Sequence, residues 1–137
     1  MNYCVNMPRV AHETLDDETI IIDFEQGTYY SLAGISHWIW FLLTKEQSVA
    51  QIVNQITLHY TGEQEEIEAA VRQFIGQLAQ GHLIVQTDKL PALSVTLPLR
   101  QPAPFSPPCL EEHTDIQDLL LLDPIHEVGQ QGWPMRN

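Results

Sequence analysis

The hydrophobic residues in the first part of the chain change their spacing near residue 33. Before this point, three segments are rich in β-branched and aromatic residues, which favours strands; they are 9–15, 19–24 and 28–32. In the second segment the alternating residues that share one face are Ile20, Ile22 and Phe24. Turn-forming pairs, Asp16-Asp17 and Gln26-Gly27, separate the segments. The pattern therefore predicts a three-stranded antiparallel meander.

Beyond residue 34 the hydrophobic residues recur three or four positions apart, as in an amphipathic helix. The apolar stripe of the first helix consists of Ile35, Trp38, Ile39, Leu42 and Leu43. Because residues two positions apart do not share a helix face, Trp38 is expected in the core and Trp40 is expected to be half-exposed. A second helix is expected to carry Val49, Ile52, Val53, Ile56 and Tyr60, with Ser48 and Gln51 as its capping box.

A third helix is predicted after residue 61. Thr61 and Gln64 have the spacing of another capping box, and the expected apolar stripe is Ile67, Val71, Phe74 and Leu78. Gly81 is expected to end this helix as its C′ residue, and residues 82–85 then form a possible short strand. The meander followed by three helices predicts an α+β fold of winged-helix type.

The composition divides the chain into four regions. Residues 1–8 form an N-terminal segment, and residues 9–86 form the folded domain, which contains no proline. Residues 87–112 hold six of the nine prolines, so they are expected to form an extended, semi-rigid linker. Residues 113–137 form an extended C-terminal tail that is both acidic and apolar.

The charge of the chain argues against a nucleic-acid partner. Eighteen acidic residues against six basic ones give a formal net charge of −12, which repels phosphate backbones. In a winged helix the third helix would contact DNA, yet here its only cation is Arg72, beside Glu63, Glu65, Glu66 and Glu68. A transcription factor is therefore the least favoured class.

The sequence also offers no sign of catalysis or of a membrane span. The spacing of the two cysteines and six histidines fits no metal site, and the familiar nucleophile and phosphate-loop motifs are absent. We therefore expect no catalytic residues, no metal and no cofactor. Without an apolar signal segment or a long apolar run, the expected location is cytoplasmic, and Cys4 and Cys109 are expected to stay reduced.

The order of these features resembles the PqqD family, the recognition elements for ribosomally synthesised, post-translationally modified peptides. The resemblance covers about residues 9–85 and is carried by "RVAHE", by the strand pair that ends in "GTYYSL", and by the "IW" and "LL" pairs of the first helix. It implies a non-catalytic peptide-binding chaperone. Such a protein captures the leader of a precursor peptide and delivers the core peptide to a separate modification enzyme.

The resemblance also implies where the leader binds. A meander leaves unpaired backbone groups along its last strand, so an extended leader can add there as a fourth strand. The expected strand contacts are Thr28, Tyr29, Tyr30, Ser31 and Leu32, with one of the two tyrosines in the core. The third helix is expected to contribute Gln64, Glu68, Arg72 and Ile75. Arg72 can instead form an ordinary surface ion pair with Glu68, and Ile75 can instead belong to the core.

The tail carries apolar residues that need a cover in water. They are Leu119, Leu120, Leu121, Leu122, Ile125, Val128 and Trp133. Three outcomes are open: docking in trans on the modification enzyme, which we favour; docking in cis on the sheet edge, which would inhibit leader binding; and no role. A protein-interaction adaptor with a partner other than a leader is the alternative function, and the chain is expected to be a monomer or a homodimer.

Overall fold

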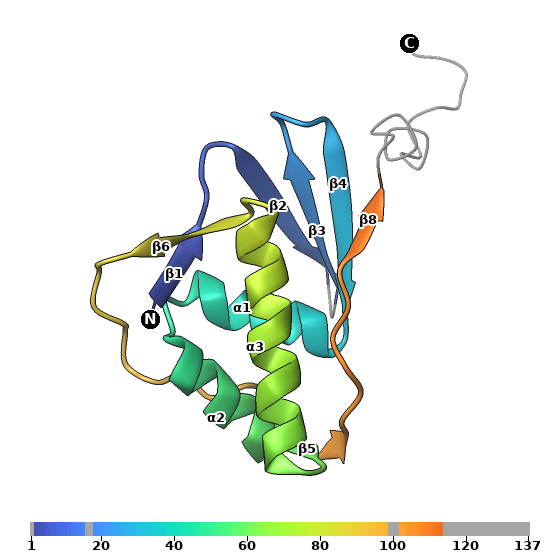
Figure 1. Ribbon diagram of the computed structural model, residues 1–137, viewed down its shortest axis with the longest axis vertical. Helices are drawn as coiled ribbons and strands as arrows, with labels where there is room; N and C mark the ends of the chain where they lie inside the picture. The colour runs from blue at the N-terminus through green and yellow to red at the C-terminus, as the bar shows by residue number, and fades with distance from the viewer. Residues whose placement is uncertain (1, 16–17, 99–101, 114–137) are drawn as a thin grey trace.

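The computed structural model describes residues 2–15, 18–98 and 102–113. In this part of the chain three strands of a four-stranded antiparallel sheet precede three helices, and the fourth strand follows them. The longest helix crosses in front of the other two in Figure 1. The α+β class and the three helices are confirmed. The winged-helix subclass stays a prediction.

The sheet contains the predicted meander and one further strand. Its strands, in spatial order, are β2 (Val10–Leu15), β3 (Glu18–Asp23), β4 (Thr28–Ala33) and β8 (Glu111–His113). In β3 the buried residues are Thr19, Ile21 and Asp23. The face shared by Ile20 and Ile22 is only half-buried, and Phe24 beyond it is exposed. The core therefore lies on the face of β3 opposite to these three residues.

Helix α1 (Ile35–Thr44) is buried on more than one side, which corrects the expectation for its tryptophans. Trp40 is 1% exposed, whereas Trp38 is only partly buried. The indole ring of Trp40 meets the ring of His12 from β2 edge-on, with 5.5 Å between the ring centroids. Because the sheet covers this side of α1 as well, the single apolar stripe in the sequence understates the buried surface.

Helix α2 (Val49–His59) begins as predicted. The Ser48 hydroxyl accepts a hydrogen bond from the backbone N–H of Gln51, and the Gln51 side chain accepts one from the backbone N–H of Ser48. Helix α3 (Gln64–Gln80) begins differently, because Glu63 is its N-cap residue and no side chain caps it. The predicted capping box at Thr61 is therefore wrong. Thr61 instead belongs to a short strand, β5 (Tyr60–Thr61).

The end of α3 leads into a second small sheet. Gly81 is the C-cap residue, and His82 takes the left-handed conformation with a φ of 62°. The predicted short strand follows as β6 (Ile84–Thr87). It pairs antiparallel with β1 (Asn2–Val5), which the sequence pattern did not predict. Residues 114–137, including the apolar tail residues named above, lie outside the described residues.

We expect Ser48→Ala to lower the free energy of unfolding by about 1 kcal/mol, because an N-cap hydroxyl is lost. Thr61→Ala is the matched control, since its exposed side chain caps no helix. Urea denaturation of both variants gives the measurement. Equal losses in the two variants would contradict the assigned cap.

Candidate peptide-binding groove

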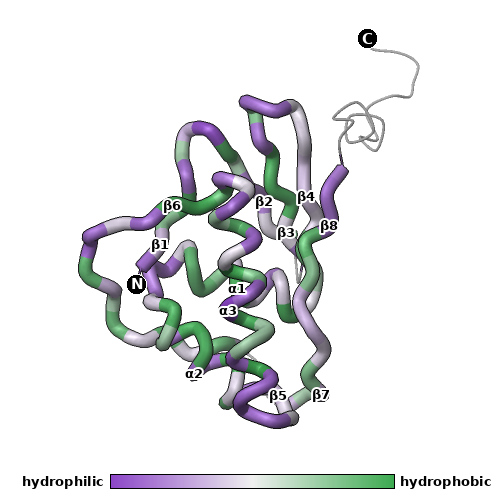
Figure 2. The backbone as a smooth tube through the Cα atoms, in the orientation of Figure 1, coloured by the Kyte–Doolittle hydropathy of each residue, from purple (hydrophilic) through white to green (hydrophobic). Residues whose placement is uncertain are grey.

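An extended segment of the chain itself lies between β4 and α3. This docked segment, residues 103–113, passes along one side of α3 from β5 to the outer edge of β4 (Figure 1). It begins with β7 (Ala103–Pro104) and ends with β8. Figure 2 shows β8 as hydrophilic and the residues just before it as hydrophobic. The groove between β4 and α3 therefore already accommodates an extended peptide.

The first part of the docked segment is held at the start of α3. β7 pairs in parallel with β5, and the backbone N–H of Phe105 donates to the carbonyl oxygen of Thr61 at 3.0 Å. The Phe105 side chain lies over Gly62, whose φ of 147° suits glycine. A Cβ atom at Gly62 would lie 3.5 Å from the Cβ of Phe105. The backbone at Gly62 thus lies within van der Waals reach of the Phe105 side chain.

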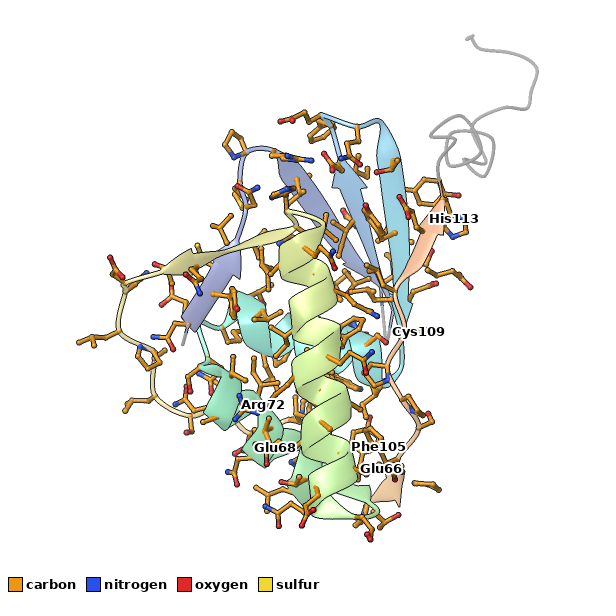
Figure 3. All side chains as sticks on the ribbon, in the orientation of Figure 1. Glu66, Glu68, Arg72, Phe105, Cys109 and His113 are labelled. Carbon is orange, nitrogen blue, oxygen red and sulfur yellow. The ribbon has the colours of Figure 1, made fainter. Side chains whose placement is uncertain are left out.

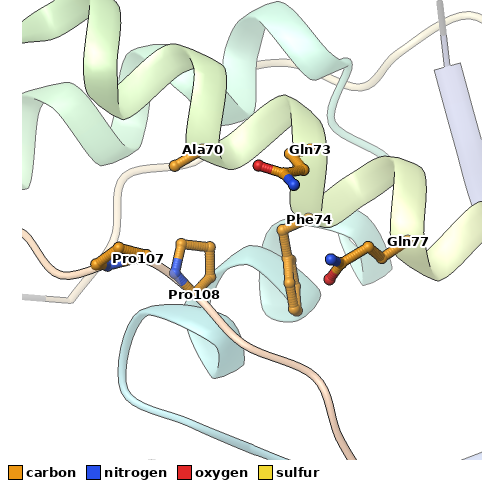
Figure 4. Close-up of a pocket in the computed structure, with 6 residues that line it drawn as sticks. All are labelled: Ala70, Gln73, Phe74, Gln77, Pro107 and Pro108. Atoms are coloured by element: carbon orange, nitrogen blue, oxygen red, sulfur yellow. The ribbon is translucent and has the colours of Figure 1, made fainter.

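The middle of the docked segment crosses α3 at a small hollow of about 120 Å³. Figure 4 shows the prolines of the segment facing side chains of α3 across this hollow. The residues that line it are Ala70, Gln73, Phe74, Gln77, Pro107 and Pro108. Proline fixes φ near the extended region, so the two prolines favour the conformation in which the segment docks.

The last part of the docked segment binds through its backbone. The N–H of Cys109 donates to the Ser36 hydroxyl at 2.9 Å, and that hydroxyl donates to the carbonyl oxygen of Cys109 at 3.1 Å. β8 then pairs antiparallel with β4, with Tyr30 opposite Glu112. The ring of His113 stacks on the ring of Tyr29, with 4.5 Å between their centroids. A single hydroxyl at the start of α1 therefore fixes the segment where it turns onto the sheet.

The strand residues predicted to bind a peptide do lie in this groove, but the edge is not free as expected. Thr28, Tyr29, Tyr30 and Leu32 are buried, and Ser31 is half-buried. Tyr30 and Leu32 belong to the core cluster, whereas Tyr29 contacts the docked segment. The free edge was a wrong expectation, because β8 covers β4 with this chain's own backbone.

The helix residues predicted to bind a peptide lie elsewhere on α3. Gln64, Glu68 and Arg72 border a hollow shared with α2, and Figure 3 shows Glu68 and Arg72 on the side of α3 away from Phe105. The Arg72 guanidinium donates to the Glu68 carboxylate at 2.9 Å, as an exposed ion pair. Ile75 is 2% exposed and belongs to the core. Their role in peptide binding stays a prediction from the sequence, and the Arg72 variant described under the proposed function tests it.

Sequence reasoning missed the residues of α3 that face the docked segment. Among these, Ala70, Gln73 and Gln77 follow the i, i+3, i+7 spacing of one helix face. A small residue followed by two glutamines gives no apolar or charged signal. Only the position of the docked segment marks this face.

Asp23 holds the hairpin that presents β4. Its side chain is buried and accepts hydrogen bonds from the Arg9 guanidinium, at 3.2 Å to each carboxylate oxygen, and from the backbone N–H groups of Glu25 and Gln26. Burial acts to raise the pKa of the Asp23 carboxyl. The hydrogen bonds from Arg9 and from the two backbone amides outweigh it, so the pKa lies below its usual value. The carboxylate therefore stays charged at neutral pH.

The described residues contain no cluster of histidine, cysteine and acidic side chains that suits a metal ion. Within the same residues, no helix has the length and hydropathy to cross a membrane. The chemistry visible in the groove is backbone pairing and apolar contact. Together these features define a class: a small α+β domain whose sheet edge and third helix hold an extended peptide segment.

Comparison with known proteins finds the same resemblance. The family model described as "Coenzyme PQQ synthesis protein D (PqqD)" matches residues 18–84, so the resemblance drawn from the sequence is confirmed. A solved structure titled "TbiB1 in Complex with the TbiA(beta) Leader Peptide" is similar, with a TM-score of 0.57 and 26% sequence identity. The match covers 63% of this chain and 99% of that one. No curated protein compared with the chain matches it significantly.

Proposed function

We propose that this protein is a non-catalytic chaperone that binds the leader of a ribosomally synthesised precursor peptide in the groove between β4 and α3. It presents the precursor to a separate modification enzyme. The observation that carries the proposal is the antiparallel pairing of an extended segment with β4. A groove that accommodates this segment has the length, the backbone groups and the apolar contacts that an extended leader needs.

The comparisons support the same function. The match to the PqqD family model covers β3 to the start of β6, which includes β4 and α3. The similar TbiB1 structure contains a leader peptide, as its title states. In the proposed complex the leader pairs with β4 as an added strand. Backbone hydrogen bonds then give affinity, and side-chain contacts with Tyr29 and α3 give selectivity.

The test is a calorimetric titration of the full chain with leader peptides of precursors encoded by neighbouring genes. We expect saturable binding, and slower hydrogen exchange in β4 and α3 than in the absence of peptide. Arg72→Glu is expected to change the affinity less than about twofold, because Arg72 lies on the α2 side of α3 and exposed charges are screened. A tenfold loss in this variant would place the leader beside α2.

If no leader binds, even after the docked segment has been loosened as described below, the leader function is wrong. The adaptor function then takes its place, since the same groove can hold an extended segment of another protein. Affinity purification with the full chain as bait identifies that partner.

A further inference from the structure

The docked segment occupies the edge of β4 on which the proposed leader binds. Two peptides cannot pair with the same edge of one strand, because each backbone N–H and carbonyl oxygen on that edge accommodates one neighbour. The docked segment also covers the α3 hollow and uses the Ser36 hydroxyl. Every contact surface of the groove described above is therefore filled in this chain.

A second feature keeps the docked segment near the groove. Residues 88–98, here called the tether, connect β6 to the residues before β7 and lie against α2. Three side-chain amides spaced four residues apart hold the tether backbone; they belong to Gln47, Gln51 and Gln55. Gln47 donates to the carbonyl oxygen of Leu93 and accepts from the N–H of Val95.

The tether is anchored at its far end as well. Gln55 accepts a hydrogen bond from the N–H of Leu97 at 3.1 Å, and the Leu97 side chain is 2% exposed. Only four residues, 99–102, separate the tether from β7. A segment tethered this closely is presented to its groove at an effective concentration on the order of 1 mM or more.

We propose that residues 103–113 are a built-in competitor for the groove, so that a peptide from another molecule binds β4 and α3 only when this segment leaves. The inference deepens the proposed function and rests on it for the identity of the displacing peptide, a leader. If the groove is free only about 1% of the time, the apparent dissociation constant of any external peptide is raised about 100-fold. Only peptides that bind tightly then displace the docked segment from the groove.

The contacts of the tether favour docking of residues 103–113 on their own domain over docking on a second copy of the chain. The hydrogen bonds that hold the tether, from Gln47 to Gln55, are made within the same chain as far as Leu97. In the sequence only residues 99–102 separate the tether from β7, so the docked segment is available to the groove of its own domain. An exchange between copies is nevertheless a distinct outcome, which the experiment below identifies.

The experiment compares Cys109→Pro with Cys109→Ala in the full chain. The side chain of Cys109 is exposed, so alanine removes little, whereas proline removes the N–H that donates to Ser36. Hydrogen exchange of residues 28–32 is measured without any added peptide. We expect exchange at least about tenfold faster in Cys109→Pro and unchanged exchange in Cys109→Ala, with residues 19–22 of β3 unchanged in both as a control for folding.

A synthetic peptide of residues 102–113 then serves as the external probe. It is expected to bind Cys109→Pro with an affinity at least about tenfold higher than its affinity for the wild-type chain, and to slow exchange in β4 again. Leu110→Asp is a second variant, because Leu110 is a partly buried residue of the docked segment that packs against the core. Leu110→Asp is expected to show the same faster exchange in β4 and the same tighter binding of the probe as Cys109→Pro.

Three results would overturn the proposal. Exchange in β4 that is equal in the wild type and both loosened variants would show that the segment does not cover the groove. Equal affinity of wild type and variants for the probe would show that it does not compete. A dimer in which the segments are exchanged, with concentration-dependent protection of β4, would assign the occupant to a second copy. If the probe binds Cys109→Pro but no leader does, the proposed function fails while the competitor remains.

Discussion

Replacing Ala70 by arginine is expected to empty the groove and keep it empty. Ala70 lines the hollow between α3 and the two prolines of the docked segment, where a long charged side chain competes for their space. Arginine is a good helix former, so α3 should remain intact. We expect hydrogen exchange in β4 to become at least about tenfold faster, equivalent to about 1.4 kcal/mol, both with and without an added leader.

An exposed glutamine on the α2 side of the same helix provides a matched control. Gln64→Arg adds the same side chain and the same charge to α3, but Gln64 borders the hollow shared with α2 instead of the docked segment. Its exchange profile and leader binding are expected to equal those of the wild type. Ala70→Arg is also expected to differ from Cys109→Pro, because an added peptide restores protection of β4 only in Cys109→Pro. Restored protection in Ala70→Arg would mean that the peptide does not contact this face of α3.

Replacing Asp23 by asparagine is expected to cause the largest loss of stability of the substitutions considered. The buried carboxylate satisfies the Arg9 guanidinium and two backbone N–H groups, and a neutral amide cannot accept all these hydrogen bonds as strongly. We expect the free energy of unfolding to fall by roughly 2–4 kcal/mol, as is usual when buried charged hydrogen bonds are broken. Urea denaturation measures this loss.

Glu25→Gln is the control for the Asp23 variant. Glu25 is the second carboxylate beside Arg9, at 3.3 Å, but its side chain is 69% exposed. Exposed ion pairs contribute little, so we expect less than about 0.5 kcal/mol. Similar losses in both variants would mean that the charge of Arg9, rather than the buried network around Asp23, is what matters.

The same network predicts a pH dependence. The folded-state pKa of Asp23 lies below its unfolded value, which is about 3.9, so its contribution is fully present above about pH 5. This contribution is lost as the pH falls from there through the folded-state pKa. Stability of the wild type should therefore fall more steeply below about pH 5 than stability of Asp23→Asn. Parallel curves for the two proteins would exclude a role for this carboxylate.

The sequence by itself determined the helices and strands whose formation depends on residues close together in the chain. β-branched runs separated by turn pairs specified β2, β3 and β4, and the three-to-four-residue spacing of apolar residues specified the three helices. The capping box at Ser48 was also found, because both of its hydrogen bonds lie within four residues. The predicted strand of the groove, residues 28–32, follows from the same local patterns and from the family resemblance.

Only the tertiary structure decided which faces of these elements are covered. Trp40 is buried because β2 lies over a side of α1 that no helical period marks as apolar. The face of α3 at Ala70 borders the groove, whereas the face of Arg72 borders α2. Both outcomes depend on how separate elements pack together, and a periodic pattern within one helix carries no information about its neighbours.

The occupant of the groove was likewise decided by tertiary structure. Residues 111–113 are two glutamates and a histidine, which have little intrinsic preference for a strand, yet they pair with β4 about 80 residues earlier in the chain. Two sets of contacts remote in sequence bring them there: the hydrogen bonds between the Ser36 hydroxyl and Cys109, and those between the tether and the glutamines in and just before α2. Because backbone hydrogen bonds form this pairing, almost any sequence can make it, and side-chain patterns alone do not reveal it.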